Sequence, residues 1–368
     1  MKKKLLLTLT VLGAFAFVGC SKKTTKNTTS GNTTVVTTKV NPSSTKANST
    51  TKSGEPTSSV EYEQGNTIKH EIVKDSRGNI LSLKSAYKGE EDSEYKYYVK
   101  IESTYNSYNL VTETRYYTFD SLENDWVITF KNTYAYNAEN KVAVQFENNI
   151  KSNTQTRLTY EYANGKRIAY EYAKFNGEEY VNTTRYSTVY EGDNPKTDLT
   201  QKWDTTTNSW VNYRKEVKTF ENNLEVSFIE YDWNGEYWVN NAKGEIEYYT
   251  GTNQEKYYTY YMWNSSSNAF VPYSKYYYDY DENGRRNIQI DYDYKDGEWK
   301  EASKYESTYP YVDNASYTSI YYSYDSETGD WKKTSKSIAI VDKYDNWAKS
   351  TSYKWDSTIN DWVEVDYM

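Results

Sequence analysis

A motif that returns about every 30 residues limits the fold of this chain more than any other feature of its sequence. Each copy reads as an aromatic residue, Asp or Asn, a few turn-forming residues and a second aromatic residue, as in Trp203-Asp204 followed by Asn208-Ser209-Trp210. The copy at Phe146 lacks the second aromatic residue. Self-similarity at a fixed period indicates a tandem array, here of about ten units. The aromatic residues that open the units are Tyr87, Phe119, Phe146, Phe175, Trp203, Trp233, Trp263, Tyr294, Tyr324 and Trp355.

Each unit is predicted to contain two strands and two turns. A second set of turn signals, such as Asn164-Gly165 and Asn283-Gly284, lies halfway between the aromatic motifs. Asn-Gly supplies the positive φ that tight hairpins need, and Asp and Asn favour the longer turns. Between the turns, larger and more polar residues alternate, as from Thr156 to Tyr162, which is typical of strands. The chain is therefore predicted to be an all-β antiparallel meander of about 20 strands.

Composition decides how such a long meander can be packed. Twisted sheets rarely exceed about 10 strands without curling or splitting. The mean hydropathy of −1.00 is too low for large aliphatic cores, but 17% of the residues are aromatic. We therefore expect a coiled or spiral single-layer sheet in which Tyr and Trp side chains replace an aliphatic core. The alternative is a β-propeller of five four-stranded blades.

The first residues indicate export and lipidation. Residues 1–19 combine a Lys-rich start with a 15-residue apolar run, which is typical of a signal peptide. The run ends in Phe17-Val18-Gly19-Cys20, which resembles the lipobox of bacterial lipoproteins. The resemblance implies cleavage before Cys20, a diacylglycerol on its thiol and an acylated amino terminus. The membrane would then be a partner through Cys20, with the outer membrane as the location in a Gram-negative host.

A polar segment separates this anchor from the repeats. Residues 21–59 contain no aromatic residue and are rich in Thr, Ser, Asn and Lys, so residues 20–59 are predicted to form a disordered tether. The repeat domain is predicted to span residues 60–368. The net charge of −8 divides into +8 for residues 1–59 and −16 for residues 60–368. Such an acidic domain excludes nucleic acid as a partner, because phosphates are bound by Lys and Arg.

Two half-unit turns resemble a known repeat. The stretches Tyr280-Asp281-Glu282-Asn283-Gly284-Arg285 and Tyr162-Ala163-Asn164-Gly165-Lys166-Arg167 resemble the YD repeats of bacterial Rhs-type surface and toxin-shell proteins. The resemblance implies hairpins in a spiralling sheet, and it transfers no toxin activity and no catalytic residue.

Catalytic and metal chemistry find little support. The single Cys and single His exclude an intrachain disulfide and a multi-histidine metal centre. His70 is expected to face solvent rather than act as a base, and with a single His no Ser-His-Asp triad is predicted. The run from Asp279 to Gly284 begins like a calcium loop, but Ile290 stands where the bidentate acid should be. We therefore predict no enzyme, no catalytic or metal-binding residue and no cofactor.

The aromatic residues at the turns are the candidate contacts for a ligand. Their rings could stack on sugars while Asp and Asn bond the hydroxyls, or they could pair across the hairpin and hold it closed. The presence of both aromatics in most copies favours pairing, and Trp347 lies outside the repeat. The sequence predicts a lipid-anchored surface protein that binds or adheres to a glycan or protein, with a structural spacer or self-assembling component as the alternative. The candidate contact residues are Trp203, Trp210, Trp233, Trp238, Trp263, Trp347, Trp355 and Trp362.

Overall fold

A computed structural model describes residues 56–63, 67–311 and 315–365. The predicted signal peptide, Cys20 and most of the predicted tether lie outside the described residues. The first strand begins at Thr57, three residues before the predicted start of the repeat domain. In the described part of the chain, no helix has the length and apolar character needed to cross a membrane.

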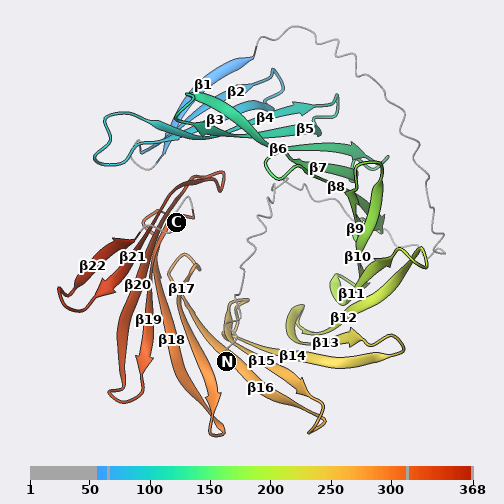
Figure 1. Ribbon diagram of the computed structural model, residues 1–368, viewed down its shortest axis with the longest axis vertical. Coiled ribbons are helices and arrows are strands. Elements are labelled where there is room, and N and C mark those ends of the chain that lie inside the picture. The colour runs from blue at the N-terminus through green and yellow to red at the C-terminus, as the bar shows by residue number, and fades with distance from the viewer. Residues whose placement is uncertain (1–55, 64–66, 312–314, 366–368) are drawn as a thin grey trace. The chain divides into compact units, whose positions relative to one another are not determined.

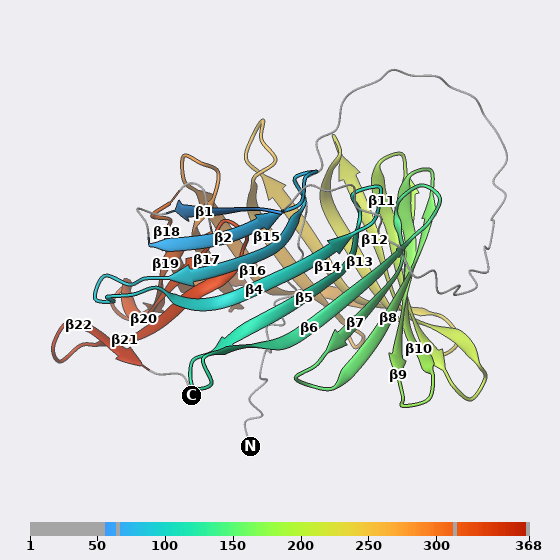
Figure 2. The ribbon, with the colours of Figure 1, turned by 90° about the horizontal axis from the view of Figure 1, so that it is seen from above.

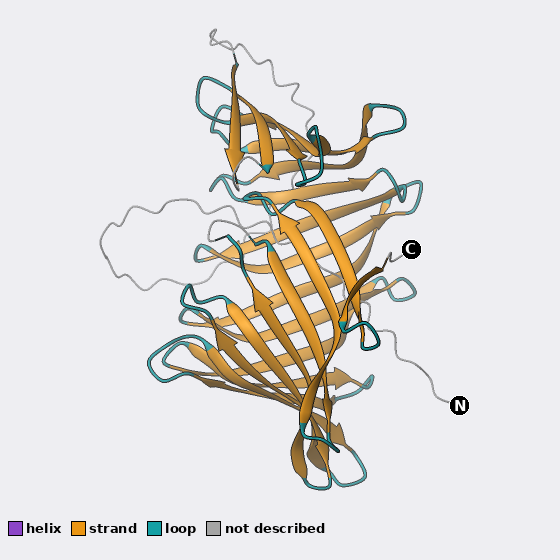
Figure 3. Ribbon diagram, turned by 90° about the vertical axis from the view of Figure 1, so that its left-hand side faces the viewer, coloured by secondary structure: helices purple, strands orange, loops and turns teal. Residues whose placement is uncertain are grey.

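The described residues form 22 strands, and every element drawn is a strand or a loop (Figure 3). The first eleven are β1 (Thr57–Glu63), β2 (Ile68–Lys74), β3 (Ile80–Tyr87), β4 (Lys96–Tyr105), β5 (Val111–Asp120), β6 (Asp125–Tyr136), β7 (Val142–Asn149), β8 (Thr154–Ala163), β9 (Lys166–Phe175), β10 (Tyr180–Glu191) and β11 (Asn194–Asp204). The remaining eleven are β12 (Ser209–Glu221), β13 (Leu224–Trp233), β14 (Trp238–Tyr248), β15 (Glu255–Asn264), β16 (Ala269–Tyr280), β17 (Arg286–Lys295), β18 (Glu298–Thr308), β19 (Tyr317–Asp325), β20 (Asp330–Val341), β21 (Trp347–Asp356) and β22 (Asp361–Val365).

All strands belong to one open sheet in which each strand pairs antiparallel with the next (Figure 1). The predicted all-β meander is confirmed. The propeller alternative is wrong, because separate blades would interrupt the hydrogen-bonded ladder, and the ladder is continuous from β1 to β22.

Regularly placed β-bulges explain why the sheet coils. Between β11 and β12 the register shifts after Thr200 and leaves Tyr213 unpaired, and between β15 and β16 it leaves Tyr273 unpaired. A second shift occurs near the other end of the strands, as after Asp279 in β16. A bulge bends its strand and increases the local right-handed twist. Because the bulges recur along the array, the strands follow one another around a common axis (Figures 1 and 2).

Tyrosine hydroxyl groups tie neighbouring strands together at the turns that follow even-numbered strands. The Tyr136 hydroxyl donates to the Val111 carbonyl at 2.6 Å, and Tyr248 donates to the Glu225 carbonyl at 2.8 Å. The same contact recurs in six of the units, and in each of them one tyrosine satisfies a carbonyl at the start of the preceding strand. The other tyrosines in this role are Tyr105, Tyr162, Tyr190 and Tyr309.

Aromatic side chains pack against one another along the sheet, beside buried apolar residues that are mainly Ala, Ile, Leu and Val. Phe228 is 9% exposed and lies between Tyr258 and Tyr260, with ring centroids 6.4 and 6.3 Å away. Tyr170 stacks on Tyr186 at 4.9 Å. Each such ring buries a large apolar area while its hydroxyl remains able to reach a polar partner.

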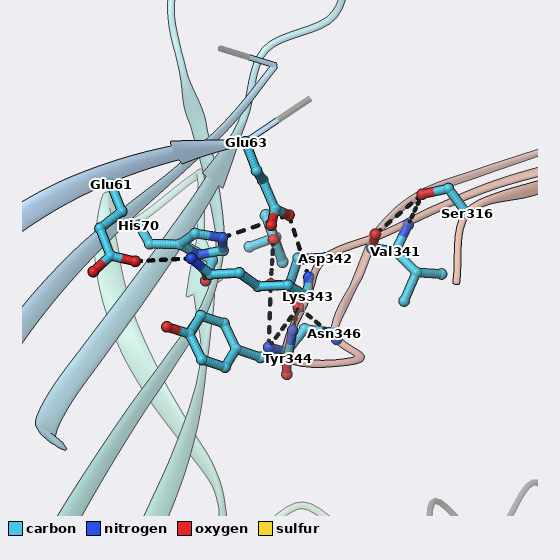
Figure 4. Close-up of polar contacts among 11 residues, drawn as sticks. Glu61, Glu63, His70, Ser316, Val341, Asp342, Lys343, Tyr344 and Asn346 are labelled. Atoms are coloured by element: carbon cyan, nitrogen blue, oxygen red, sulfur yellow. Dashed lines mark hydrogen bonds and ion pairs between the residues drawn. The ribbon is translucent and has the colours of Figure 1, made fainter. Parts of the chain in front are cut away.

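The two ends of the array meet at a contact that we call the closing contact. It joins the turn between β20 and β21 to strands β1 to β4 (Figure 4). The Tyr98 hydroxyl donates to Asp342 Oδ2 at 2.7 Å, across 244 residues of sequence, and Asp342 is fully buried. The Lys343 ammonium lies 2.8 Å from Glu61 Oε2. The coil is therefore fastened by polar contacts between residues that are far apart in the sequence.

His70 belongs to the closing contact, and the expectation that it faces solvent is wrong. Its side chain is fully buried; Nδ1 lies 2.9 Å from Ser85 Oγ, and Nε2 lies 3.5 Å from Glu63 Oε1. Its ring also meets the Tyr344 ring edge-on, with centroids 5.1 Å apart. The reason is alternation: Ile68, His70 and Ile72 share one face of β2, and that face is covered.

Burial of His70 predicts a loss of stability in mild acid. Desolvation holds the pKa of His70 below its ordinary value of about 6.5, so the folded protein binds this proton less readily than the unfolded chain. The stabilisation is complete above pH 6.5 and is lost as the pH falls below it. We expect the free energy of unfolding, measured by urea titration, to decrease between pH 7 and pH 5, with a slope approaching about 1.4 kcal/mol per pH unit.

The comparison variant for this prediction is His70→Gln. Burial also raises the pKa of Glu147, Glu171, Glu225 and Glu230, and these groups give the opposite slope. The difference in slope between the wild type and His70→Gln isolates the contribution of the imidazole, because His70 is the single histidine. Equal slopes in the two proteins would contradict the prediction.

Candidate functional site: the tryptophan rim

The turns that follow odd-numbered strands carry most of the predicted site residues, and we call this end of the strands from β5 to β22 the tryptophan rim. Pairs of aromatic rings flank eight of these turns, with centroids 4.9 to 5.3 Å apart and seven of the eight pairs edge to face. The two rings of each pair belong to residues directly opposite each other in the ladder. The eight pairs are Phe119–Trp126, Phe175–Tyr180, Trp203–Trp210, Trp233–Trp238, Trp263–Phe270, Tyr294–Trp299, Tyr324–Trp331 and Trp355–Trp362.

The turns themselves explain the rest of the motif. Asp204 Oδ1 accepts a hydrogen bond from the Thr206 amide at 2.8 Å, and Asn234 Oδ1 accepts one from the Glu236 amide at 3.0 Å. Asn208 has a φ of 51°, a left-handed conformation that Asn tolerates better than other non-glycine residues. The acids and amides expected to bond sugar hydroxyls therefore have a structural role in the turn. Each aromatic pair contributes about 0.2–1 kcal/mol to its hairpin.

Two of the predicted unit-opening residues lie elsewhere. In the hairpin of β7 and β8, Asn148 and Gln155 take the paired position, and Phe146 instead packs against Tyr180 of the next unit at 5.6 Å. Tyr87 lies opposite Lys96. The polar replacement shows that a hairpin of this array can form without its aromatic pair.

The structure brings together seven of the eight candidate ligand contacts and separates the last one. Trp203, Trp210, Trp233, Trp238, Trp263, Trp355 and Trp362 all belong to pairs on the tryptophan rim and are half-buried. Trp347 opens β21 at the opposite end of the strands, faces Val341 in the ladder and is 53% exposed. It therefore cannot act together with the rim residues on a small ligand.

Lysine side chains lie over several of the paired rings. The ammonium of Lys215 lies 4.8 Å from the Trp238 ring centre, and that of Lys333 lies 4.5 Å from Trp355. Acidic groups accompany them, since a hydrogen bond from Lys332 lowers the pKa of Asp325 to about 2. The rim thus presents aromatic, cationic and anionic groups in alternation at neutral pH.

Exposed apolar side chains also occur in three turns of the rim, and sequence reasoning missed them. Leu122 is 93% exposed, Ile359 is 62% exposed and Tyr237 is 61% exposed, and each lies in a rim turn. Further exposed apolar residues directly follow a paired aromatic residue. The three turns follow one another at intervals of eight strands, so these side chains are separate exposed positions along the rim. The available signal was an apolar residue within an otherwise polar turn. The flanking residues are Val127, Val211 and Val363.

The closing contact contains groups that could suggest catalysis, but it is sealed. Ser85, His70 and Glu63 lie in the order nucleophile, base and acid, a constellation that the sequence did not predict. Ser85 and His70 are fully buried, so no substrate can reach the Ser85 hydroxyl. The arrangement is a structural polar network. Within the described ranges, no cluster of three or more His, Cys, Asp or Glu side chains could hold a metal ion.

Comparison with known proteins yields distant structural likenesses. No family model and no curated protein match the chain. A DUF3836 family protein from Bacteroides vulgatus ATCC 8482 is 19% identical over 32% of this chain and 89% of its own, with a TM-score of 0.19. A porin-like protein from Bacteroides uniformis ATCC 8492 is 10% identical over 67% of this chain and 91% of its own, with a TM-score of 0.29.

A chain of a TcdB2-TccC3-TEV crystal structure is similar over a longer part of this protein. The TcdB2-TccC3 structure is 10% identical over 81% of this chain and 20% of its own, with a TM-score of 0.21. All three likenesses are too distant to assign a family or a function. The function therefore has to be argued from the surface of this chain.

Proposed function

We propose that this protein is a lipid-anchored, non-enzymatic component of the bacterial cell envelope that binds a surface glycan or protein partner through the tryptophan rim. The observation that carries the proposal is the recurrence of strongly exposed apolar residues in rim turns, at Leu122, Tyr237 and Ile359. A polar residue could occupy each of these turn positions without loss to the hairpin. Each of the three side chains instead exposes apolar surface to water. Covering this surface with a partner would recover about 25 cal/mol per Å² of apolar area.

Because the motif repeats, the rim extends over many hairpins. Successive aromatic pairs are two strands apart, a spacing of roughly 10 Å when neighbouring strands are about 4.8 Å apart. A partner with its own repeat, such as a polysaccharide, could contact several turns at once. Linked weak contacts raise the overall affinity far above that of one contact. Anchoring through Cys20, as the lipobox resemblance implies, would present many such rims on one membrane.

The proposal is tested with the triple variant Leu122→Asn, Tyr237→Asn and Ile359→Asn. The three positions are exposed turn positions, so we expect the melting temperature to stay within about 2 °C of the wild type, since exposed substitutions usually cost under 0.5 kcal/mol. Binding of the full-length protein to glycan arrays and to immobilised extracellular-matrix proteins should fall at least about tenfold, the result of losing 1.4 kcal/mol.

Tyr108→Asn is the matched control. Tyr108 is 72% exposed and lies in a turn at the opposite end of the strands, so its replacement removes similar surface away from the rim. Binding that survives in the triple variant and disappears in Tyr108→Asn would contradict the proposal. Wild-type binding to glycans alone would identify the partner as carbohydrate, and binding to proteins alone would identify it as protein.

A structural spacer is the second candidate. It is favoured by the turn geometry, since Asp204, Asn208 and the paired rings all have roles within their own hairpin. A spacer requires no exposed apolar turn residues, and a wild-type protein that binds neither panel would support it.

A further inference from the structure

We infer that a groove across β18, β19 and β20 is a second ligand site, with the chemistry to hold a neutral saccharide of one or two rings. This site goes beyond the proposed function, because it lies on the other face of the sheet. In β19, Ser319 lines the groove and Tyr324 belongs to an aromatic pair. Successive side chains of a strand point to opposite faces, so these two residues, five apart in an unbulged strand, lie on opposite sides.

Three serines form the floor of the groove. Ser307 pairs with Ser319 in the ladder, and Ser319 pairs with Ser337, so the three short side chains lie in a row across three strands. Ser307 Oγ donates to Ser319 Oγ at 3.2 Å. Larger residues stand on both sides of this row, and the resulting cavity has a volume of about 420 Å³. That volume falls within the range of roughly 300–1,000 Å³ that is usual for small-molecule sites.

Two tyrosines form opposite walls. Tyr305 precedes Ser307 by two residues and is 40% exposed, with its ring 4.8 Å from that of Tyr321. Tyr309 follows Ser307 by two residues, and its hydroxyl donates to the Arg286 carbonyl at 2.6 Å. The Arg285 guanidinium lies 4.5 Å from the Tyr309 ring centre. Both rings are therefore held in place, as a surface for stacking a sugar ring requires.

An unsatisfied acceptor at the groove points to a ligand that donates hydrogen bonds. Asn287 lines the cavity, and its Oδ1 atom is buried without a hydrogen-bond partner. Asn287 is the extra residue of the bulge between β16 and β17, so its side chain has no ladder partner to align with. A buried acceptor without a donor is costly, and a ligand hydroxyl would relieve that cost.

The charges around the groove favour a neutral ligand over an anion. The cation among the lining residues is Arg286, and its guanidinium is already committed. It lies 3.4 Å from Glu255 Oε2 and 3.5 Å from the centre of the Tyr278 ring. Serine hydroxyls, the amide groups of Asn287 and Gln289 and three tyrosine rings remain, and this set matches the alternating hydroxyl and C–H surfaces of a sugar.

The test is isothermal titration of the full-length protein with cellobiose and with maltose, beside inorganic phosphate as the anionic probe. Ser319→Leu places a bulky side chain on the groove floor and should weaken disaccharide binding at least about tenfold. Ser323→Leu is the matched control, since it lies on the same face of the same strand and does not line the groove. Asn287→Leu, which removes the unsatisfied acceptor, should weaken binding similarly and covers the case in which Ser319→Leu does not fold.

Each outcome decides the inference. Disaccharide binding that survives in Ser323→Leu and in the rim triple variant, but is lost in Ser319→Leu or Asn287→Leu, would establish the groove as a saccharide site. Binding of neither disaccharide by the wild type would overturn it, as would unchanged binding in folded Ser319→Leu. Binding of phosphate alone would overturn the assignment to a neutral ligand. The rim triple variant and the groove variants are measured separately. Failure of the groove inference can therefore be distinguished from failure of the rim proposal.

Discussion

Replacing Asp342 with Ala is expected to lower the free energy of unfolding by about 3 kcal/mol, since it removes a fully buried acceptor on which several donors depend. The Asp342 carboxyl group accepts from the Tyr98 hydroxyl at 2.7 Å and from the Tyr344 and Asn346 amides at 2.9 Å each. Truncation would leave all three donors buried or half-buried without this partner. Urea unfolding at pH 7 measures the loss.

The matched control for this variant is Asp281→Ala. Asp281 caps a turn of the same kind, accepting from the Asn283 amide at 2.9 Å and the Arg285 amide at 2.8 Å, and its ion pair is with Arg285 of the same turn. We expect a loss of about 1 kcal/mol there. Tyr98→Phe combined with Asp342→Ala should cost less than the sum of the two single variants, because they break one shared contact. Equal losses for Asp342→Ala and Asp281→Ala would show that the closing contact contributes nothing beyond its turn.

Replacing Gly244 with Ala should destabilise the sheet by about 2–3 kcal/mol through overpacking. Gly244 lies opposite Phe228 in the ladder, and the Phe228 ring covers it. A Cβ atom at this position would lie 2.9 Å from Cδ1 of Phe228 and closer still to Cε1 and Cζ. The backbone of β14 cannot move away without breaking its ladders to β13 and β15. Thermal and urea unfolding of the single variant give the size of the loss.

A second substitution tests the cause. Phe228→Leu removes the ring that clashes, so Gly244→Ala in that background should cost about 1 kcal/mol or less. Ala242, two residues away on the same strand, is fully buried and already carries a Cβ. A penalty for Gly244→Ala that is the same in both backgrounds would place its origin in the backbone rather than in the Phe228 ring.

The two-stranded unit of this fold could be predicted from the sequence because the residues that define each hairpin lie close together in the chain. The motif from Trp203 to Trp210 encodes an aromatic pair, a capping Asp and an Asn in left-handed conformation within eight residues. Repetition then predicts the meander. The first hairpin, β1 with β2, carries no motif, which is why 22 strands are found where about 20 were expected.

The closing contact and the groove could not be predicted because they depend on long-range geometry. Asp342 begins a turn that resembles the one at Asp281, and nothing within that turn reveals that Tyr98 lies against it. His70 sits in a strand whose alternation is visible, but its burial follows from the docking of Tyr344. The serine row of the groove likewise depends on the pairing registers of three strands. β-Bulges in this part of the sheet shift those registers by one residue.

The central claim of this account is that the sheet coils until the turn between β20 and β21 meets its first strands, and cross-linking tests it most directly. In a Cys20→Ser background, which leaves no other thiol, Glu61→Cys with Lys343→Cys replaces an ion pair of 2.8 Å whose members are 282 residues apart. A short bis-maleimide should join the two thiols within one folded molecule and change its mobility on a denaturing gel. The link should fail to form in urea or when Lys196→Cys replaces the second partner. A folded protein with both cysteines reactive, but never joined within one molecule, would contradict the coiled arrangement.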